Sequence, residues 1–67
     1  MIAVQINGQD KVIAKSTTLR EYLDSLGVDL KHIAVAHNGK VLRREELPHV
    51  TLSEGDSVEI VRAVGGG

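Results

Sequence analysis

The chain of 67 residues contains no cysteine, so it cannot form a disulfide. Domains of this size often rely on disulfides or a metal ion for stability. The three histidines are not spaced like a metal cluster, and we expect no metal site. Stability must therefore come from a compact core of isoleucine, valine and leucine. The lack of cysteine is also typical of a cytoplasmic protein.

Aromatic residues and an excess of one charge are missing as well. Tyr22 is the only aromatic residue, and 8 basic side chains face 9 acidic ones. Nucleic-acid-binding proteins usually show a basic surface or stacking aromatics, so no nucleic-acid partner is expected. Apolar runs such as residues 33–36 are far shorter than a membrane span, and the first residues show no secretory signal pattern. No membrane partner is expected either.

Alternating and turn-forming residues predict five strands. Residues 2–6 alternate in polarity, as in a half-buried strand. The following "NGQD" predicts a hairpin, since Asn-Gly tolerates the positive φ of tight turns, and residues 11–14 form its second strand. "IAVAHNGKVL" reads as strand, Asn-Gly turn and strand. Residues 57–62 alternate again, with Val58 and Ile60 on one face.

One helix is predicted between the two pairs of strands. Thr18 and Glu21 fit a capping box, and Gly27 stands where a left-handed C-cap belongs. An apolar stripe follows helical spacing; it consists of Leu19, Tyr22, Leu23 and Leu26. Further along, "REELP" predicts a helical turn that stops at Pro48, because the residue before proline avoids the α region.

The order β-β-α-β-β-β predicts an α+β fold, the ubiquitin-like β-grasp, in which a mixed sheet packs on one helix. The pairing of the first strand with the last is assumed, because periodicity does not reveal it. We expect the domain to comprise residues 1–62. Residues 63–67, the tail, are expected to be a flexible glycine-rich segment.

The sequence offers little catalytic machinery. Nucleophilic catalysis needs a hydroxyl or thiol beside an oriented base, and the serines fall at predicted caps and turns. His32 and His37 would point to opposite faces of one strand, so we interpret the histidines as solvated or rim residues. Glu45 and Glu46 are adjacent and do not face each other. No phosphate-binding glycine motif is present, and we expect no pocket of several hundred Å³. We conclude that the chain is not an enzyme.

The tail is the remaining place for chemistry. Gly65 and Gly66 have no side chains, so the chain there could pass through a narrow channel and present the carboxylate of Gly67 to a partner. Activation of that carboxylate would need ATP and a partner enzyme, since this chain has no phosphate loop. The alternative is a disordered end without function.

Residues beside the tail are candidates for partner contact. On the last strand, Val61 should face away from the helix. Val61 and Arg62 would then lie close to Val64, at the start of the tail, and an exposed apolar patch there favours an interaction site. The alternative is scattered surface valine, which has no special role.

The segments "TTLREYLDSLG", "IAVAHNGKVLRREEL" and "LSEGDSVEIVRAVGGG" resemble the ThiS family of sulfur carriers in thiamine biosynthesis, over the whole chain. The chain has Leu42 where many members have proline, and Leu47 where they often have tryptophan. Both positions look structural. A Gly-Gly end also fits MoaD-like molybdopterin carriers, tRNA-thiolation sulfur carriers and ubiquitin-like protein modifiers, which remain alternatives.

The resemblance implies a sequence of events at Gly67. A ThiF-like or MoeB-like adenylyltransferase uses ATP to adenylate its carboxylate. Sulfur that originates from a cysteine desulfurase displaces AMP and leaves a C-terminal thiocarboxylate, which a ThiG-like thiazole synthase consumes. Gly66 and Gly67 match the family's glycine pair. The chain itself would bind no cofactor, and ATP would belong to the activating partner.

Overall fold

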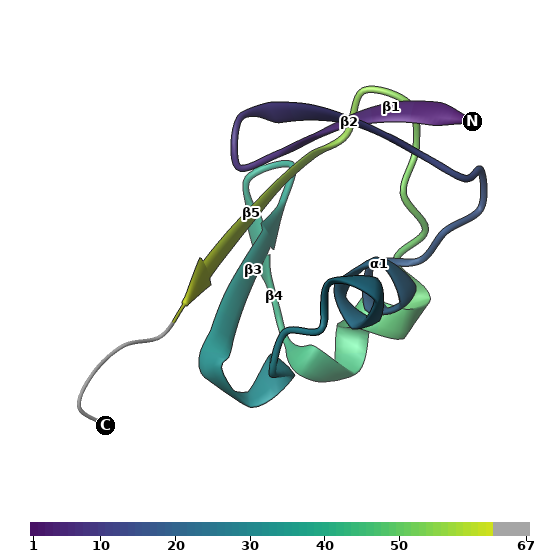
Figure 1. Cartoon of the computed structure of the whole chain (residues 1–67). Helices are drawn as coiled ribbons and strands as arrows, with labels where there is room; N and C mark the ends of the chain where they lie inside the picture. The colour runs from purple at the N-terminus through teal and green to yellow at the C-terminus, as the bar shows by residue number, and fades with distance from the viewer. Residues whose placement is uncertain (63–67) are drawn as a thin grey trace.

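The computed structural model describes residues 1–62, and the predicted tail lies outside them. Its elements are short and follow one another closely (Figure 1): β1 (Ile2–Ile6), β2 (Gln9–Ile13), α1 (Leu19–Leu26), the 3₁₀ turn η1 (Leu30–His32), β3 (Ile33–His37), β4 (Lys40–Leu42), the 3₁₀ turn η2 (Arg44–His49) and β5 (Ser57–Arg62). No helix in this part of the chain is long and apolar enough to cross a membrane. The domain boundary after residue 62 stays a prediction.

The five strands form one mixed sheet in the order β2-β1-β5-β3-β4. The first and last strands do pair, in parallel, with Gln5 opposite Ser57 and Ile6 opposite Val58. All other neighbouring strands are antiparallel. The strand that precedes the tail is therefore the central strand. The α+β class and the β-grasp order are confirmed.

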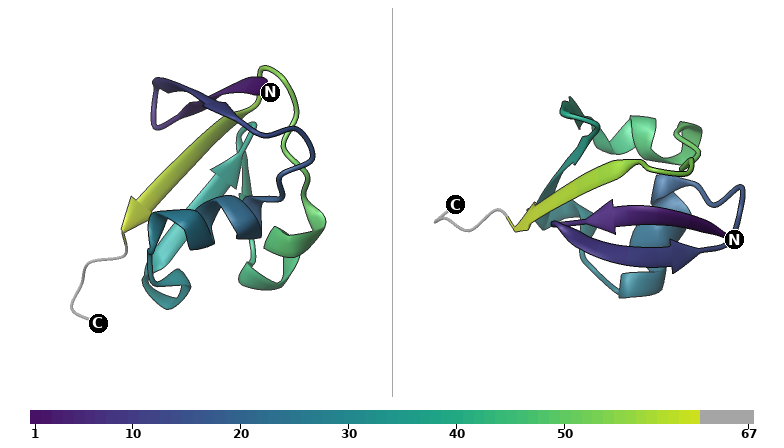
Figure 2. Two further views of the ribbon diagram at one scale, coloured as in Figure 1. Left: turned by 45° about the vertical axis from the view of Figure 1, so that its right-hand side comes forward. Right: turned by 90° about the horizontal axis from the view of Figure 1, so that it is seen from above.

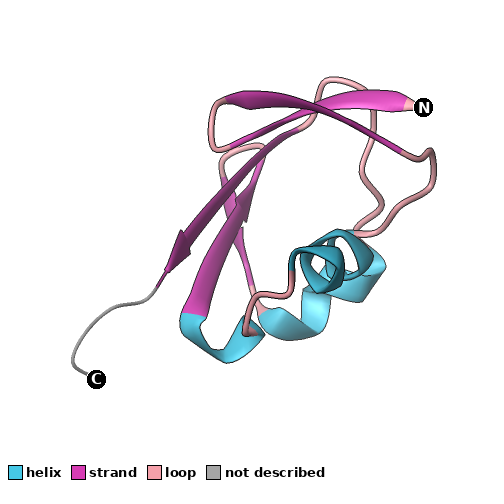
Figure 3. Cartoon of the chain, in the orientation of Figure 1, coloured by secondary structure: helices cyan, strands magenta, loops and turns pink. Residues whose placement is uncertain are grey.

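One face of the sheet is covered and the other is open. Figures 2 and 3 show α1 and η2 on the same side of the strands. The buried core lies between these layers and is wholly apolar: Val4, Ile6, Leu19, Leu23, Val35, Leu47, Leu52 and Val58. The strand residues in this core alternate along their strands, as period-2 burial requires.

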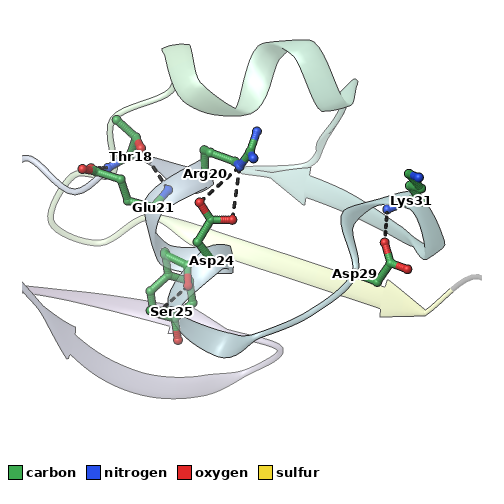
Figure 4. A network of polar contacts seen from close by, with 8 residues as sticks. Thr18, Arg20, Glu21, Asp24, Ser25, Asp29 and Lys31 are labelled. Carbon is green, nitrogen blue, oxygen red and sulfur yellow. Dashed lines mark hydrogen bonds and ion pairs between the residues drawn. The ribbon is translucent and has the colours of Figure 1, made fainter.

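The ends of α1 follow the predicted chemistry. Thr18 Oγ1 accepts the backbone N–H of Glu21 at 3.1 Å, and Glu21 Oε1 accepts the backbone N–H of Thr18 at 2.9 Å (Figure 4). Gly27 ends the helix at φ +73°, in the left-handed region. The stripe prediction was wrong at Leu26, whose side chain is 48% exposed, because the last turn of α1 extends past the core.

Three boundaries differ from the sequence prediction. β2 starts at Gln9 rather than residue 11, because Asn7 (φ +51°) and Gly8 (φ +81°) complete the turn by themselves, and it ends at Ile13 rather than residue 14. The turn η2 also runs through Pro48 to His49. At its two ends, hydrogen bonds go from Glu46 N–H to the Arg43 carbonyl and from Val50 N–H to the Leu47 carbonyl. Neither bond needs the N–H that proline lacks.

Candidate functional site

The end of β5 places two of the predicted contact residues at the surface. Val61 lies opposite Ala34 of β3 and is 60% exposed on the open face of the sheet. Arg62 is exposed and is the last described residue. Val64, Gly65, Gly66 and Gly67 lie outside the described residues, so their predicted roles stay predictions.

Val61 is part of a larger apolar surface on the open face. Ala36 lies two residues beyond Ala34 on β3, and it pairs in turn with Val41 of β4, which is 72% exposed. We call Ala34, Ala36, Val41 and Val61 the outer-face strip. Ala34 and Ala36 lie between Val61 and Val41, and their short side chains project less from the sheet than the two valines do. This exposed apolar strip borders Glu59, which lies opposite Ala36 on β5. An exposed apolar surface next to the tail is typical of a contact site.

A surface hollow lies beside the end of β5, contrary to the expectation of no sizeable pocket. Its volume is about 720 Å³, and these residues line it: Leu26, Gly27, Val28, Asp29, His32, Ile33, Ile60 and Arg62. The turn η1 within this lining was not predicted from the sequence. The segment from the end of α1 through η1 forms one wall, and β3 and β5 supply the rest.

Charged groups of both signs surround this hollow. Asp29 Oδ1 accepts the Lys31 backbone N–H at 3.0 Å (Figure 4), and Asp29 Oδ2 lies 2.9 Å from His32 Nδ1. The bond from the Lys31 N–H and the contact with His32 hold the pKa of Asp29 below its usual value. His32 lies in η1 and not on a strand, so the predicted opposition of two strand histidines was wrong.

His37 also has a carboxylate partner, which the sequence did not indicate. Its Nε2 lies 2.8 Å from Asp56 Oδ2, which also accepts the Ser53 backbone N–H at 2.9 Å. Burial by itself raises the pKa of Asp56, but the hydrogen bonds from His37, Ser53 and Asn38 outweigh it and the pKa is lowered. This cluster joins the β3–β4 turn to the start of β5, and its role is structural.

Glu45 and Glu46 do not form an acid–base pair. Glu46 Oε1 accepts the Arg43 backbone N–H at 2.7 Å and so caps η2, while Glu45 is exposed. Among residues 1–62, no three histidine or acidic side chains are grouped so as to hold a metal ion.

A five-stranded mixed sheet on one helix, with β5 at its centre, defines a ubiquitin-like β-grasp protein. Comparison with known proteins identifies the family to which the chain belongs within this class. The family model of the ThiS family matches residues 4–67. The chain therefore belongs to the ThiS family, the sulfur carrier proteins of thiamine biosynthesis.

Individual relatives agree in length as well as in sequence. The sulfur carrier protein ThiS of Thermus thermophilus is 38% identical, with 96% of this chain and 98% of that protein covered. The crystal structure of the thiamine biosynthesis protein ThiS from Geobacter metallireducens has a TM-score of 0.86 at 33% identity, covering 98% of this chain and all of that one.

A thiazole synthase of Paramagnetospirillum magneticum is also similar, at 36% identity over 92% of this chain. The chain spans only 19% of that protein. A segment like this chain thus occurs within a much longer thiazole synthase.

The two departures from the family pattern are structural positions, as expected. The Leu47 side chain is 2% exposed in the core, and Leu42 packs against the core from β4. Leucine at these positions fills core space and leaves the open face of the sheet unchanged.

Proposed function

We propose that the chain carries sulfur as a thiocarboxylate on the carboxyl group of Gly67 and donates it to thiazole formation in thiamine biosynthesis. The observation that carries this proposal is the ThiS family match, which includes the glycine run at residues 65–67. The agreement in length with relatives named as sulfur carrier proteins supports it.

The proposed chemistry has two steps, and partner enzymes catalyse both of them on the Gly67 carboxylate. A carboxylate oxygen of Gly67 attacks the α-phosphorus of ATP, a P–O bond forms, and pyrophosphate leaves. Hydrosulfide (HS⁻) then attacks the carbonyl carbon and a C–S bond forms. AMP departs with the electrons of the C–O bond, and loss of the S–H proton leaves the thiocarboxylate. The chain contributes backbone without side chains at residues 65–67, which can approach a partner closely.

The outer-face strip is our candidate for the docking surface. An adenylyltransferase of the ThiF or MoeB type would contact Val61 and Arg62 while the tail extends into its active site. Thiazole synthase is the proposed acceptor of the sulfur, and the ThiS-like segment within longer thiazole synthases supports this pairing. A cysteine desulfurase would act only indirectly, as the source of sulfur.

We further propose that the chain is no enzyme, binds no cofactor, and works in the cytoplasm. Within residues 1–62, His32 and His37 contact carboxylates, and neither hydrogen-bonds a serine or threonine hydroxyl that it could activate. The reducing cytoplasm suits a chain without cysteine.

Pyrophosphate release tests the activation step. The full chain is mixed with ATP and its adenylyltransferase, and a chain lacking Gly67 is the matched control. We expect pyrophosphate release only with the full chain. Equal release from both chains, or none from either, would refute activation at Gly67. Isopeptide-linked products with other proteins, without a thiocarboxylate, would instead indicate a protein modifier.

A further inference from the structure

The two Asn-Gly turns hold the central strand from opposite sides. Asn38, in the β3–β4 turn, bonds the start of β5: its N–H donates to the Ser57 carbonyl at 2.8 Å, and its Oδ1 accepts the Ser57 N–H at 2.9 Å. Asn7, in the β1–β2 turn, bonds β5 further along. Its N–H donates to the Val58 carbonyl at 2.8 Å.

The Asn7 side chain makes a second, two-point contact with β5. Its Oδ1 accepts the Ile60 N–H at 2.7 Å, and its Nδ2 donates to the Ile60 carbonyl at 3.2 Å. A carboxamide presents one donor and one acceptor in a plane, as a peptide group does. The side chain therefore occupies the place that the next residue of β1 would take.

This replacement matters because β1 ends early. Its pairing with β5 covers only Gln5 with Ser57 and Ile6 with Val58. β5 continues past the β1–β2 turn toward the tail (Figure 1). Along residues 59–62, β3 pairs with β5 on one side. On the other side, within residues 1–62, the Asn7 carboxamide hydrogen-bonds Ile60.

The backbone conformation of the turn does not by itself require asparagine at residue 7. Glycine adopts the φ of +51° at residue 7 freely, and aspartate tolerates it. Aspartate would place a second carboxylate oxygen against the Ile60 carbonyl and lose the donor. Only asparagine supplies both the left-handed backbone and the two-point contact.

We infer that Asn7 is a positioning residue that fixes the direction in which β5 leads the tail into a partner's active site. This inference rests on the proposed function. Ile60 precedes the last described residue by two positions, so a strand end held on both sides there has little freedom to swing. Alignment of a reacting group changes rates strongly, and a displacement of about 1 Å can cost about 100-fold.

The test compares Asn7→Gly with Asn38→Gly, which removes the same carboxamide from the same kind of turn at the opposite end of β5. Both variants keep a backbone that accepts positive φ. We expect Asn7→Gly to lower kcat for chain-dependent pyrophosphate release by about tenfold with KM nearly unchanged, since the outer-face strip is intact. Asn38→Gly should keep the wild-type kcat while it remains folded. Asn7→Asp, which retains the acceptor for the Ile60 N–H, should fall between them.

Amide hydrogen exchange of Ile60 tests the contact independently of function. Exchange should be at least several-fold faster in Asn7→Gly than in the wild type and unchanged in Asn38→Gly. Unchanged Ile60 exchange would refute the claim that the Asn7 carboxamide holds β5 at Ile60. Faster exchange with wild-type kcat, or equal losses of kcat in both glycine variants, would refute positioning. If the wild-type chain is not activated at all, the proposed function fails, and this inference with it, whatever the exchange result.

Discussion

His37 Nε2 lies 2.8 Å from Asp56 Oδ2 and joins the end of β3 to the loop before β5. Both side chains are largely buried, at 21% and 13% exposure. Because the oxygen accepts, the imidazole hydrogen resides on Nε2. The contact fixes the start of the strand that leads to the tail.

This contact predicts a dependence of stability on pH. The folded state holds the pKa of Asp56 below its ordinary value of 3.8. The folded protein therefore binds fewer protons than the unfolded chain, and the stabilising contribution of Asp56 is complete above its ordinary pKa. It should be lost as the pH falls through the lower pKa of the folded state. Urea unfolding measured at a series of pH values between about 6 and 2 checks the direction.

Asp56→Asn isolates that contribution. At neutral pH we expect a loss of about 1–3 kcal/mol in the free energy of unfolding, as for hydrogen bonds to a charged group. The variant should also lose less stability on acidification than the wild type. Asp10→Asn, at an exposed carboxylate with one 3.3 Å bond from Gln5, should change stability by less than about 0.5 kcal/mol. Equal acid sensitivity of Asp56→Asn and wild type would contradict the account.

The capping box of α1 predicts a second stability effect. Thr18→Ala removes the acceptor for the Glu21 N–H and should cost about 1 kcal/mol, measured by chemical unfolding. Arg20→Ala is the control, because its ion pair with Asp24 is exposed and should contribute little. An equal effect of the two substitutions would show that the capping contacts do not stabilise the helix.

The outer-face strip predicts a defect in docking. Val61→Asp introduces a charge into the proposed contact and should raise KM for the adenylyltransferase about tenfold, equivalent to about 1.4 kcal/mol. Val41→Asp, at the other end of the strip, should act in the same direction. Val12→Asp is the matched control, since Val12 is a similarly exposed valine at 66% on the edge strand β2. If all three variants raise KM equally, the strip is not the docking surface.

Local signals predicted the helix ends and the turns because their partners lie within a few residues. The Thr18–Glu21 box, Gly27 and both Asn-Gly turns are of this kind. Asn7 and Asn38 of these turns also hydrogen-bond β5, and the sequence did not indicate these contacts. Asn7 and Ile60 are 53 residues apart, and His37 and Asp56 are 19 apart. Such contacts depend on sheet order and register.

The candidate site was predictable only in part, for the same reason. Alternation along the last strand placed Val61 outward correctly. Val41 belongs to the same surface only through the register of β4 against β3, which a three-residue strand does not reveal. The hollow beside Arg62 was missed because it depends on the unpredicted turn η1.

The central claim is that Gly67 becomes a thiocarboxylate. The most direct measurement is the intact mass of the chain after incubation with its adenylyltransferase, ATP and sulfide, with fragmentation to locate any change. The account predicts a gain equal to the difference between one sulfur and one oxygen atom, confined to the C-terminal residue and absent without ATP. An unchanged mass with an active enzyme, or a gain located elsewhere in the chain, would contradict it.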